Sequence, residues 1–262
     1  MEIFAILDSM YRPIIGIVGR ATKDNEDKSN ISTREEYRKA ILDLGGIPIL
    51  ILPPQDMYYY DTRVSETPPL TTEEKEILDK QLKLCDGILL PGGFKTFEYD
   101  TYIVDYCTKK DKPILGICLG MQIMANYGQT NENGTPKFIV EKNDEQGINH
   151  CDQDKKYVHK VTLLKESKIY QIIHQETFNV NSFHKYHILK TKKYDIVGYS
   201  EDNLIEVIEN KNNRFNIGVQ WHPERLMDDP NQINLLKEFI KISKISSKKC
   251  KKSTFLSQKS RE

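Results

Sequence analysis

The sequence predicts an α/β fold with a central, mostly parallel sheet flanked by helices and with additional antiparallel strands in the second half. Between residues 12 and 127, short apolar runs alternate with helix-like segments, and this order is typical of parallel strands covered by helices on both faces. After residue 156, strand-like runs separated by turn residues follow one another. The length of 262 residues is enough for one large α/β domain or two small ones.

The first half contains four predicted strands, each marked by a short apolar run. Pro53-Pro54 ends the second run, and Pro91-Gly92-Gly93 ends the third. The predicted strands cover residues 12–19, 47–52, 86–90 and 113–117.

Helices are predicted between these strands from apolar spacing and from end signals. Residues 33–44 have apolar side chains at helical spacing, and Gly45-Gly46 ends that helix. Thr71 and Glu74 form a capping box that opens a helix reaching about residue 84. Two further helices are predicted at 97–109 and 119–127, and the segments 21–32 and 55–70 are predicted surface loops.

The second half is predicted to be rich in strands and to end in a helix. The predicted strands cover residues 157–164, 178–183, 195–199, 204–209 and 216–221. An amphipathic helix follows at 230–242. The lysine- and serine-rich tail at 244–262 has few apolar residues and is expected to be disordered, as a solvated chain end rather than a contact for nucleic acid or anionic lipid.

Bulk composition points to a cytoplasmic protein that binds neither membrane nor nucleic acid. Lysine plus arginine equals aspartate plus glutamate, at 38 each. The longest apolar stretches, such as 46–53, are far shorter than the ~20 residues that span a bilayer, and residues 1–6 lack the layout of a secretory signal. The 5 cysteines show no CxxC pairing, which argues against a disulfide framework and a zinc site.

The most informative stretch is 114–122, where a buried strand runs into a helix with Cys118 at the junction. Gly116 and Gly120 flank the cysteine two residues to either side, as in the cysteine form of the G-x-S-x-G nucleophile elbow. Glycines leave room for such a tight bend. The N-terminus of the following helix favours a thiolate, and the N–H of Leu119 is placed to receive a developing oxyanion.

A base and its orienting carboxylate are predicted at His222-Pro223-Glu224. On an extended strand, residues i and i+2 share a face, so the imidazole and the carboxylate can point toward one site. A carboxylate beside an imidazole fixes its tautomer and stabilises the imidazolium. Cys118, His222 and Glu224 are therefore the predicted catalytic residues.

Gly92 and Gly93 end the strand predicted to lie beside the nucleophile strand. Ligands of such sheets gather at the carboxyl ends of the strands. A glycine pair there lets backbone N–H groups face a substrate oxygen, and Gly93 is the expected second oxyanion donor.

Taken in order along the chain, these segments resemble the class I glutamine amidotransferase superfamily, and within it most closely the γ-glutamyl-γ-aminobutyrate hydrolase branch. The matching segments are 13–17, 45–48 with 52–53, 86–93, 116–122, 148–150, 159–161, 180–184 and 218–224. The resemblance implies one domain over 13–243 with a flavodoxin-like sheet. It also implies attack on a small γ-glutamyl amide, a thioester intermediate, and hydrolysis by water. Gln122, Ser182, Phe183 and His184 would then hold the glutamyl end.

Three positions depart from the pattern of that branch. Leu119 replaces the usual arginine, as in synthetase-linked glutaminases. Residues 94–97 lack the usual acidic residue, and 184–186 read His-Lys-Tyr in place of His-His-Gln. These changes leave the predicted triad intact and bear on the substrate.

No cofactor and no metal are expected. On a strand, His184 and His187 would face opposite sides, so a shared metal ion is not indicated. His150 and His159 are expected to satisfy local hydrogen bonds.

Besides a free-standing γ-glutamyl hydrolase, two alternatives stay open. The chain could be a glutaminase subunit that passes ammonia to a synthetase partner, or a non-catalytic ligand-binding protein on the same fold. A homodimer is compatible with each of the three.

Overall fold

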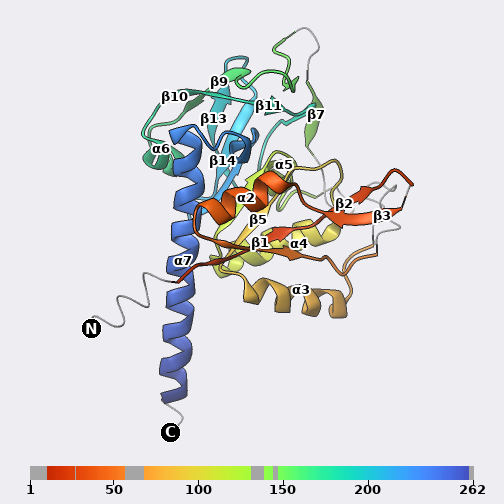
Figure 1. Ribbon diagram of the computed structural model, residues 1–262, viewed down its shortest axis with the longest axis vertical. Helices are drawn as coiled ribbons and strands as arrows, with labels where there is room; N and C mark the ends of the chain where they lie inside the picture. The colour runs from red at the N-terminus through yellow and green to blue at the C-terminus, as the bar shows by residue number, and fades with distance from the viewer. Residues whose placement is uncertain (1–10, 27, 57–67, 131–138, 144–146, 260–262) are drawn as a thin grey trace.

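A nine-stranded sheet forms the centre of the part of the chain that the computed structural model describes, which is residues 11–26, 28–56, 68–130, 139–143 and 147–259 (Figure 1). One half of this sheet is parallel. Its strands, in spatial order, are β15 (Asn216–Val219), β6 (Ile114–Ile117), β5 (Gly87–Leu90), β1 (Ile14–Val18) and β4 (Ile47–Ile51). The four strands predicted in the first half are all present here.

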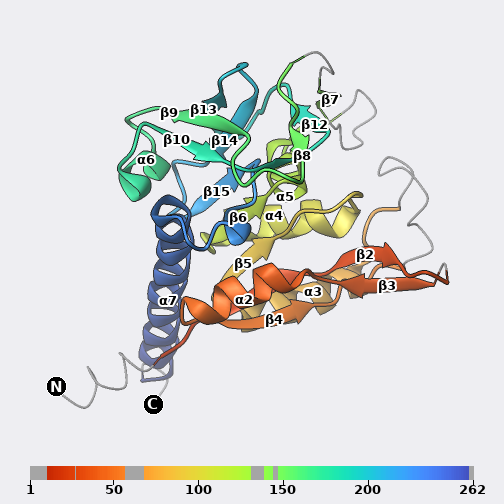
Figure 2. The ribbon, with the colours of Figure 1, turned by 45° about the horizontal axis from the view of Figure 1, so that its top comes forward.

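The other half of the sheet is antiparallel and comes from the second half of the chain. Outward from β15, its strands are β14 (Ile205–Glu209), β13 (Asp195–Ser200), β9 (His159–Leu163) and β10 (Thr177–Val180). Figures 1 and 2 show these strands on one side of the molecule and β1 and β4 on the other. The predicted class, a mostly parallel α/β sheet extended by antiparallel strands, is confirmed.

Helices cover both faces of the sheet, as the strand–helix alternation predicts. Alternate residues of a strand face opposite sides, so Leu89 packs in one apolar layer and Ile88 and Leu90 pack in the other. The first layer receives side chains from α2 (Glu35–Asp43), α6 (Lys168–Ile173) and α7 (Pro230–Lys259). The second layer receives side chains from α3 (Thr72–Leu84), α4 (Glu98–Lys110) and α5 (Leu119–Ala125).

The start of α3 is fixed by the predicted capping box. The Thr71 hydroxyl accepts a hydrogen bond from the Glu74 N–H at 3.2 Å, and the Glu74 carboxylate accepts one from the Thr71 N–H at 2.7 Å. Two N–H groups that the helix itself cannot bond are thereby satisfied.

Several elements differ from the sequence-based expectations. The predicted loop at 21–32 contains a hairpin of β2 (Arg20–Lys23) and β3 (Ser29–Ser32), whose short, mostly polar strands lack the usual apolar alternation. Short pairs β7 (Val140–Lys142) with β12 (Tyr186–Ile188) and β8 (Cys151–Asp152) with β11 (Ser182–Phe183) were not predicted, and neither was α6. Most of the loop predicted at 55–70 lies outside the described residues.

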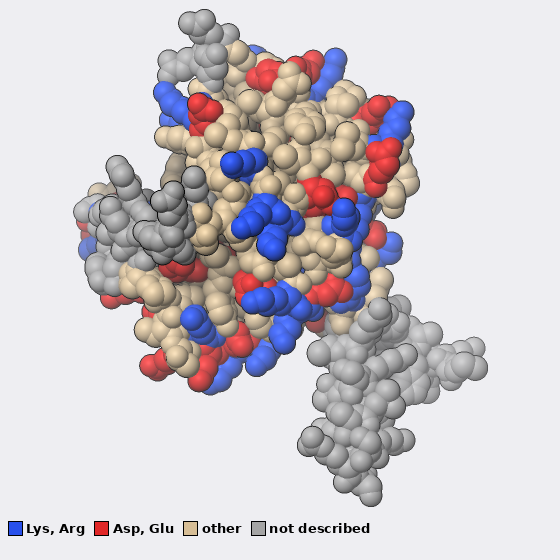
Figure 3. All heavy atoms as spheres, turned by 180° about the vertical axis from the view of Figure 1, so that it is seen from behind, with Lys and Arg blue, Asp and Glu red and all other residues tan. Residues whose placement is uncertain are grey.

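Helix α7 is longer than the sequence predicts. It continues to Lys259, past residue 242 and through most of the segment expected to be disordered. Its C-terminal part extends beyond the body of the domain (Figure 1). None of the helices in the described ranges is long and apolar enough to cross a membrane. On the face seen in Figure 3, basic and acidic side chains are interspersed.

Candidate active site

Cys118 lies in the tight turn between β6 and α5 and has a backbone conformation that is rare for any residue except glycine. Its φ is 53° and its ψ is −110°. The turn is held by the Cys118 N–H, which donates to the Val219 carbonyl at 2.9 Å, and by the Cys118 carbonyl, which accepts from the Gln122 N–H at 3.2 Å. A strained cysteine between a buried strand and a helix is the geometry of a nucleophile elbow.

The glycines that flank Cys118 allow the strand and the helix to approach closely. A Cβ atom on Gly120 would lie 1.9 Å from the carbonyl oxygen of Leu90 in the neighbouring strand. A Cβ atom on Gly116 would lie 2.3 Å from the sulfur of Met124 and 2.8 Å from the backbone of Gly120. Their role is therefore tight packing around the elbow more than freedom of backbone rotation.

His222, Glu224 and Cys118 meet at this elbow. Nδ1 of His222 lies 2.6 Å from Oε1 of Glu224, and the Cys118 side chain is close enough to the same imidazole to raise its pKa. Both Cys118 Cβ and His222 Cε1 border Gly92, at 3.4 and 3.0 Å from the position of a Cβ atom there. All three side chains are buried.

The electrostatics of this group favour a charged imidazole. Burial alone would lower the pKa of His222, but the charge of Glu224 and the hydrogen bonds to Cys118 and Glu224 raise it to about 10. An imidazolium at neutral pH can stabilise a thiolate beside it. The arrangement can therefore supply a nucleophile and a proton donor together.

The local backbone that brings His222 and Glu224 together is not the predicted strand. Strand β15 ends at Val219, and Pro223–Arg225 form a single 3-10 turn, η3. Pro223 occupies the first position of this turn, where its missing N–H costs nothing. The two side chains converge because the chain turns between them. The predicted His222–Glu224 pair therefore forms, but the extended strand from which it was predicted is wrong.

Tyr37 on α2 is a part of the site that carries no functional signal in the sequence. Its hydroxyl accepts a hydrogen bond from the Gly92 N–H at 3.0 Å and lies 3.5 Å from Nδ1 of His222. Burial, followed by the charge of Glu224, raises the pKa of Tyr37 well above its usual value, so the hydroxyl stays neutral. Because Tyr37 binds the Gly92 N–H, Gly93 is left as the candidate oxyanion donor of this turn.

Arg20 braces the same turn from the other side. Its guanidinium donates to the Pro91 carbonyl at 2.9 and 3.1 Å and to Asp100 at 2.6 Å. Arg20 and Asp100 are both buried, and the Asp100 carboxylate also accepts from the Phe97 N–H at 3.0 Å. This ion pair links the first residue of β2 and the start of α4 to the end of β5.

Asn181 holds the backbone of His222 from both sides. Its side-chain oxygen accepts from the His222 N–H at 2.8 Å, and its side-chain NH2 donates to the His222 carbonyl at 2.9 Å. Asn181 precedes β11, so this pair ties the short strand to the proposed base.

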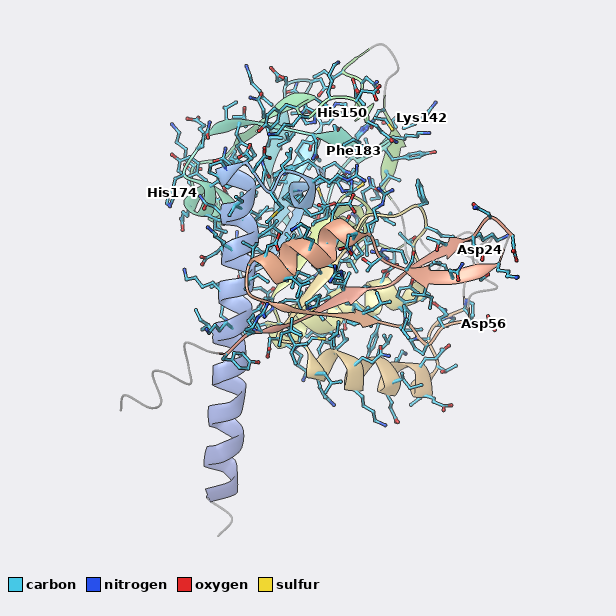
Figure 4. The ribbon with its side chains drawn as sticks, in the orientation of Figure 1. Asp24, Asp56, Lys142, His150, His174 and Phe183 are labelled. Carbon is cyan, nitrogen blue, oxygen red and sulfur yellow. The ribbon has the colours of Figure 1, made fainter. Side chains whose placement is uncertain are left out.

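The residues predicted to hold the glutamyl end divide into two groups. The ring of Phe183 packs edge-on against His222, with ring centroids 5.5 Å apart, and Arg225 lies over the same ring at 4.5 Å. Ser182 and His184 form the second group, and their buried side chains contact His150 and Glu206. Gln122 is also buried and donates to the Tyr186 carbonyl at 2.9 Å. Figure 4 shows Phe183 close to His150.

The remaining described cysteines lack the surroundings of Cys118. Burial raises the pKa of Cys85 to about 11 and also raises the pKa of Cys107. Cys151 is partly exposed and lies in a two-residue strand pairing. Among the described cysteines, only Cys118 lies in a strand–helix turn and beside an imidazole.

The chain is similar to several known proteins. The Peptidase C26 family matches residues 95–224, a segment that runs from the start of α4 through Cys118 to Glu224. A glutamine amidotransferase-like protein of Rickettsia prowazekii is 27% identical over 89% of this chain and 98% of its own length. A glutamine amidotransferase-like protein of Schizosaccharomyces pombe is 28% identical over 80% of this chain and 82% of its own.

The chain is similar to the class I glutamine amidotransferase-like proteins over most of its length. Its fold is that of the glutamine amidotransferases, and the matched family is one of hydrolases.

CTP synthases are also relatives, and this amidotransferase-like chain spans only part of them. The CTP synthase of Sulfurisphaera tokodaii is 30% identical over 80% of this chain and 41% of its own length. The chain therefore covers well under half of the CTP synthases it matches.

Solved structures share the amidotransferase fold. The glutaminase domain of the Trypanosoma brucei CTP synthase, solved with acivicin, has a TM-score of 0.58 at 17% identity and covers 88% of this chain and 93% of its own. A GMP synthase subunit of Thermoplasma acidophilum has a TM-score of 0.57 at 16% identity over 92% and 99% of the two chains.

Proposed function

We propose that this chain hydrolyses the γ-glutamyl amide bond of a small γ-glutamyl compound through a thioester on Cys118. The observation that carries the proposal is the position of His222, which lies 2.6 Å from Glu224 and borders Gly92 together with Cys118 at a strained strand–helix elbow. The match to a hydrolase family and the likeness to amidotransferase-like proteins support the same reaction class.

In the first half-reaction, the Cys118 thiolate attacks the amide carbon and the carbonyl oxygen becomes an oxyanion. The N–H groups of Leu119, at the start of α5, and of Gly93 are the proposed donors to that oxyanion. His222, held as an imidazolium by Glu224, gives its proton to the leaving amine as the carbon–nitrogen bond breaks.

In the second half-reaction, neutral His222 removes a proton from water, which attacks the thioester. The carbon–sulfur bond breaks, glutamate leaves, and the proton on His222 restores the thiolate–imidazolium pair. Glu224 orients the imidazole throughout.

The test is glutamate release from a panel of γ-glutamyl amines and peptides, with Cys118→Ala as the inactive variant. Alanine fits the elbow, so we expect the variant to fold and to lose turnover by at least about 10³-fold. Cys151→Ala is the matched control and should retain full turnover. Turnover retained in Cys118→Ala would refute the assigned nucleophile.

A second candidate function is glutaminase activity coupled to a synthetase. Leu119 after the nucleophile and the likeness to CTP synthases favour it. It predicts that the isolated chain is nearly inactive on γ-glutamyl amines, and that glutamine turnover rises when a co-purifying protein is added. Release of glutamate from γ-glutamyl amines by the chain alone would exclude this alternative.

A further inference from the structure

A buried cluster of three histidines and a glutamate lies close to the proposed active site. His150 precedes β8, His159 begins β9, His184 follows β11, and Glu206 lies in β14. The four residues are between 0% and 3% exposed, and one ligand atom of each lies within 4.8 Å of all the others. We call these four residues the histidine cluster.

The distances within the histidine cluster match a four-coordinate metal site. From Oε1 of Glu206, the separations are 3.4 Å to Nε2 of His184, 3.6 Å to Nε2 of His159 and 3.9 Å to Nδ1 of His150. Zinc ligands at about 2.0–2.1 Å in a tetrahedron are about 3.3–3.4 Å apart. A small contraction would complete the coordination.

In each imidazole, one ring nitrogen faces the other members of the cluster (the inner nitrogen) and one faces away from them (the outer nitrogen). The partner of the outer nitrogen determines which of the two carries the proton. Nδ1 of His159 contacts the Lys160 carbonyl and Nδ1 of His184 contacts the Tyr186 carbonyl, both at 3.1 Å. Nε2 of His150 contacts the Asp202 carboxylate at 3.0 Å. Carbonyl and carboxylate oxygens only accept, so each outer nitrogen donates and each inner nitrogen presents a lone pair.

The inner atoms of the cluster are therefore mostly acceptors that face one another. Within the described residues, Nε2 of His159, Nε2 of His184 and both oxygens of Glu206 have no hydrogen-bond partner. Nδ1 of His150 is 3.1 Å from the Ser182 hydroxyl, which can donate to it. Buried acceptors without donors are costly, and a cation at their centre removes that cost.

A single proton cannot replace the cation. A proton on Glu206 can donate to only one imidazole, so the other inner nitrogens that lack a partner would stay without a donor.

We propose that His150 Nδ1, His159 Nε2, His184 Nε2 and a carboxylate oxygen of Glu206 bind one divalent transition-metal ion of the zinc class. Four protein ligands and complete burial describe a closed, structural site rather than a catalytic one. His184 follows Phe183, which contacts His222, so the ion would also fix the segment that lies against the proposed base.

This inference revises the expectation that no metal binds. In the sequence only His184 and His187 are close neighbours, and His187 instead contacts Asn143 at 3.0 Å. The other ligands come from positions 150, 159 and 206, which only the folded chain brings together.

The test uses the full chain with Zn²⁺ and Co²⁺ as probes. We expect metal analysis of protein purified without chelator to give about one zinc per chain. After chelation, Co²⁺ should give the visible absorption of a tetrahedral N/O site, and Zn²⁺ should raise the Tm. Glu206→Gln keeps the size of the side chain and should weaken Zn²⁺ binding at least tenfold, as should His159→Ala. His187→Ala is the matched control and should bind as the wild type does.

Two outcomes would overturn the proposal. One is wild-type protein without bound metal whose Tm and Co²⁺ spectrum do not respond to added ion. The other is equal binding by the wild type and by a folded Glu206→Gln variant, which would place the ion at another site.

Discussion

At the scale of single residues, the proposed reaction depends on how strongly Glu224 acts on His222. The two groups are buried and 2.6 Å apart, so their attraction is weakly screened. Burial is the largest single effect and lowers the pKa of His222, but this attraction, together with the interactions with Cys118 and the hydrogen bond to Glu224, raises it to about 10. The imidazolium form of His222 should therefore persist to alkaline pH and be lost as the pH rises through that value.

Replacing Glu224 by glutamine should shift and weaken activity. Without the charge of Glu224, the pKa of His222 falls, so the alkaline limb of the kcat/KM profile should move to lower pH. The rate at neutral pH should fall by about 10²–10⁴-fold. Glu238→Gln on the surface of α7 is the control, and an unshifted pH profile in Glu224→Gln would contradict the role assigned to the carboxylate.

Tyr37→Phe should lower activity through the turn at Gly92. The change leaves the Gly92 N–H without its acceptor and removes a hydroxyl 3.5 Å from His222. An unpaired buried donor costs about 1–3 kcal/mol. We expect urea unfolding to report a loss in that range and kcat to fall more than KM changes. Tyr102→Phe is the control, because that hydroxyl contacts Asp79 on α3.

The sequence identified some of these residues and missed others for a physical reason. Cys118 and the His222–Glu224 pair are recognisable because their neighbours in the chain, the glycines and the proline, are part of the local geometry. Tyr37 and Asn181 act on His222 from 185 and 41 residues away. Their contacts exist only in the folded chain, and a helical tyrosine or a strand-end asparagine has no local mark of that role.

At the scale of elements, the close approach of α5 to β5 and β6 positions the nucleophile. Hydrophobic runs and end signals predicted these three elements correctly, because a buried parallel strand is apolar throughout. The hairpin β2–β3 was missed because its strands are short and mostly polar. The turn η3 was missed because a His-Pro-Glu sequence is compatible with either an extended or a turned backbone.

Gly120→Ala should disrupt the elbow by steric overlap. The added Cβ atom would lie 1.9 Å from the Leu90 oxygen and 2.8 Å from its carbonyl carbon, and backbone atoms cannot move aside. We expect a loss of at least about 3 kcal/mol in the free energy of unfolding. Gly45→Ala is the comparison, since its Cβ atom meets nothing within 4 Å and only its φ of +83° is unfavourable. That variant should lose about 1–2 kcal/mol, and equal losses in the two would argue against the packing explanation.

At the scale of the whole molecule, α7 connects the two halves of the fold. It contacts α6 and η3 of the second half and α2, β1 and β5 of the first. Phe239 is buried on this helix and packs against Phe215, with ring centroids 5.3 Å apart. The predicted helix at 230–242 contains this anchor, although it ends earlier than α7 does.

Phe239→Ala should destabilise the entire domain rather than one half. Removal of a buried phenylalanine ring costs about 3–5 kcal/mol. We expect a single cooperative unfolding transition at lower urea concentration. Ile245→Ala, on the same helix but 37% exposed, should change stability by no more than about 0.5 kcal/mol. Separate transitions for the two halves in Phe239→Ala would show that α7 does not couple them.

The unusual backbone angles at position 118 imply that the native residue there is not the most stable one. A residue without a side chain tolerates a φ of 53° more easily, so Cys118→Gly should relieve some of the roughly 1–3 kcal/mol that such a conformation costs and should melt above Cys118→Ala. Loss of reactivity and gain in robustness would then come from the same substitution, which would make the glycine variant the better scaffold for capturing uncleaved ligands.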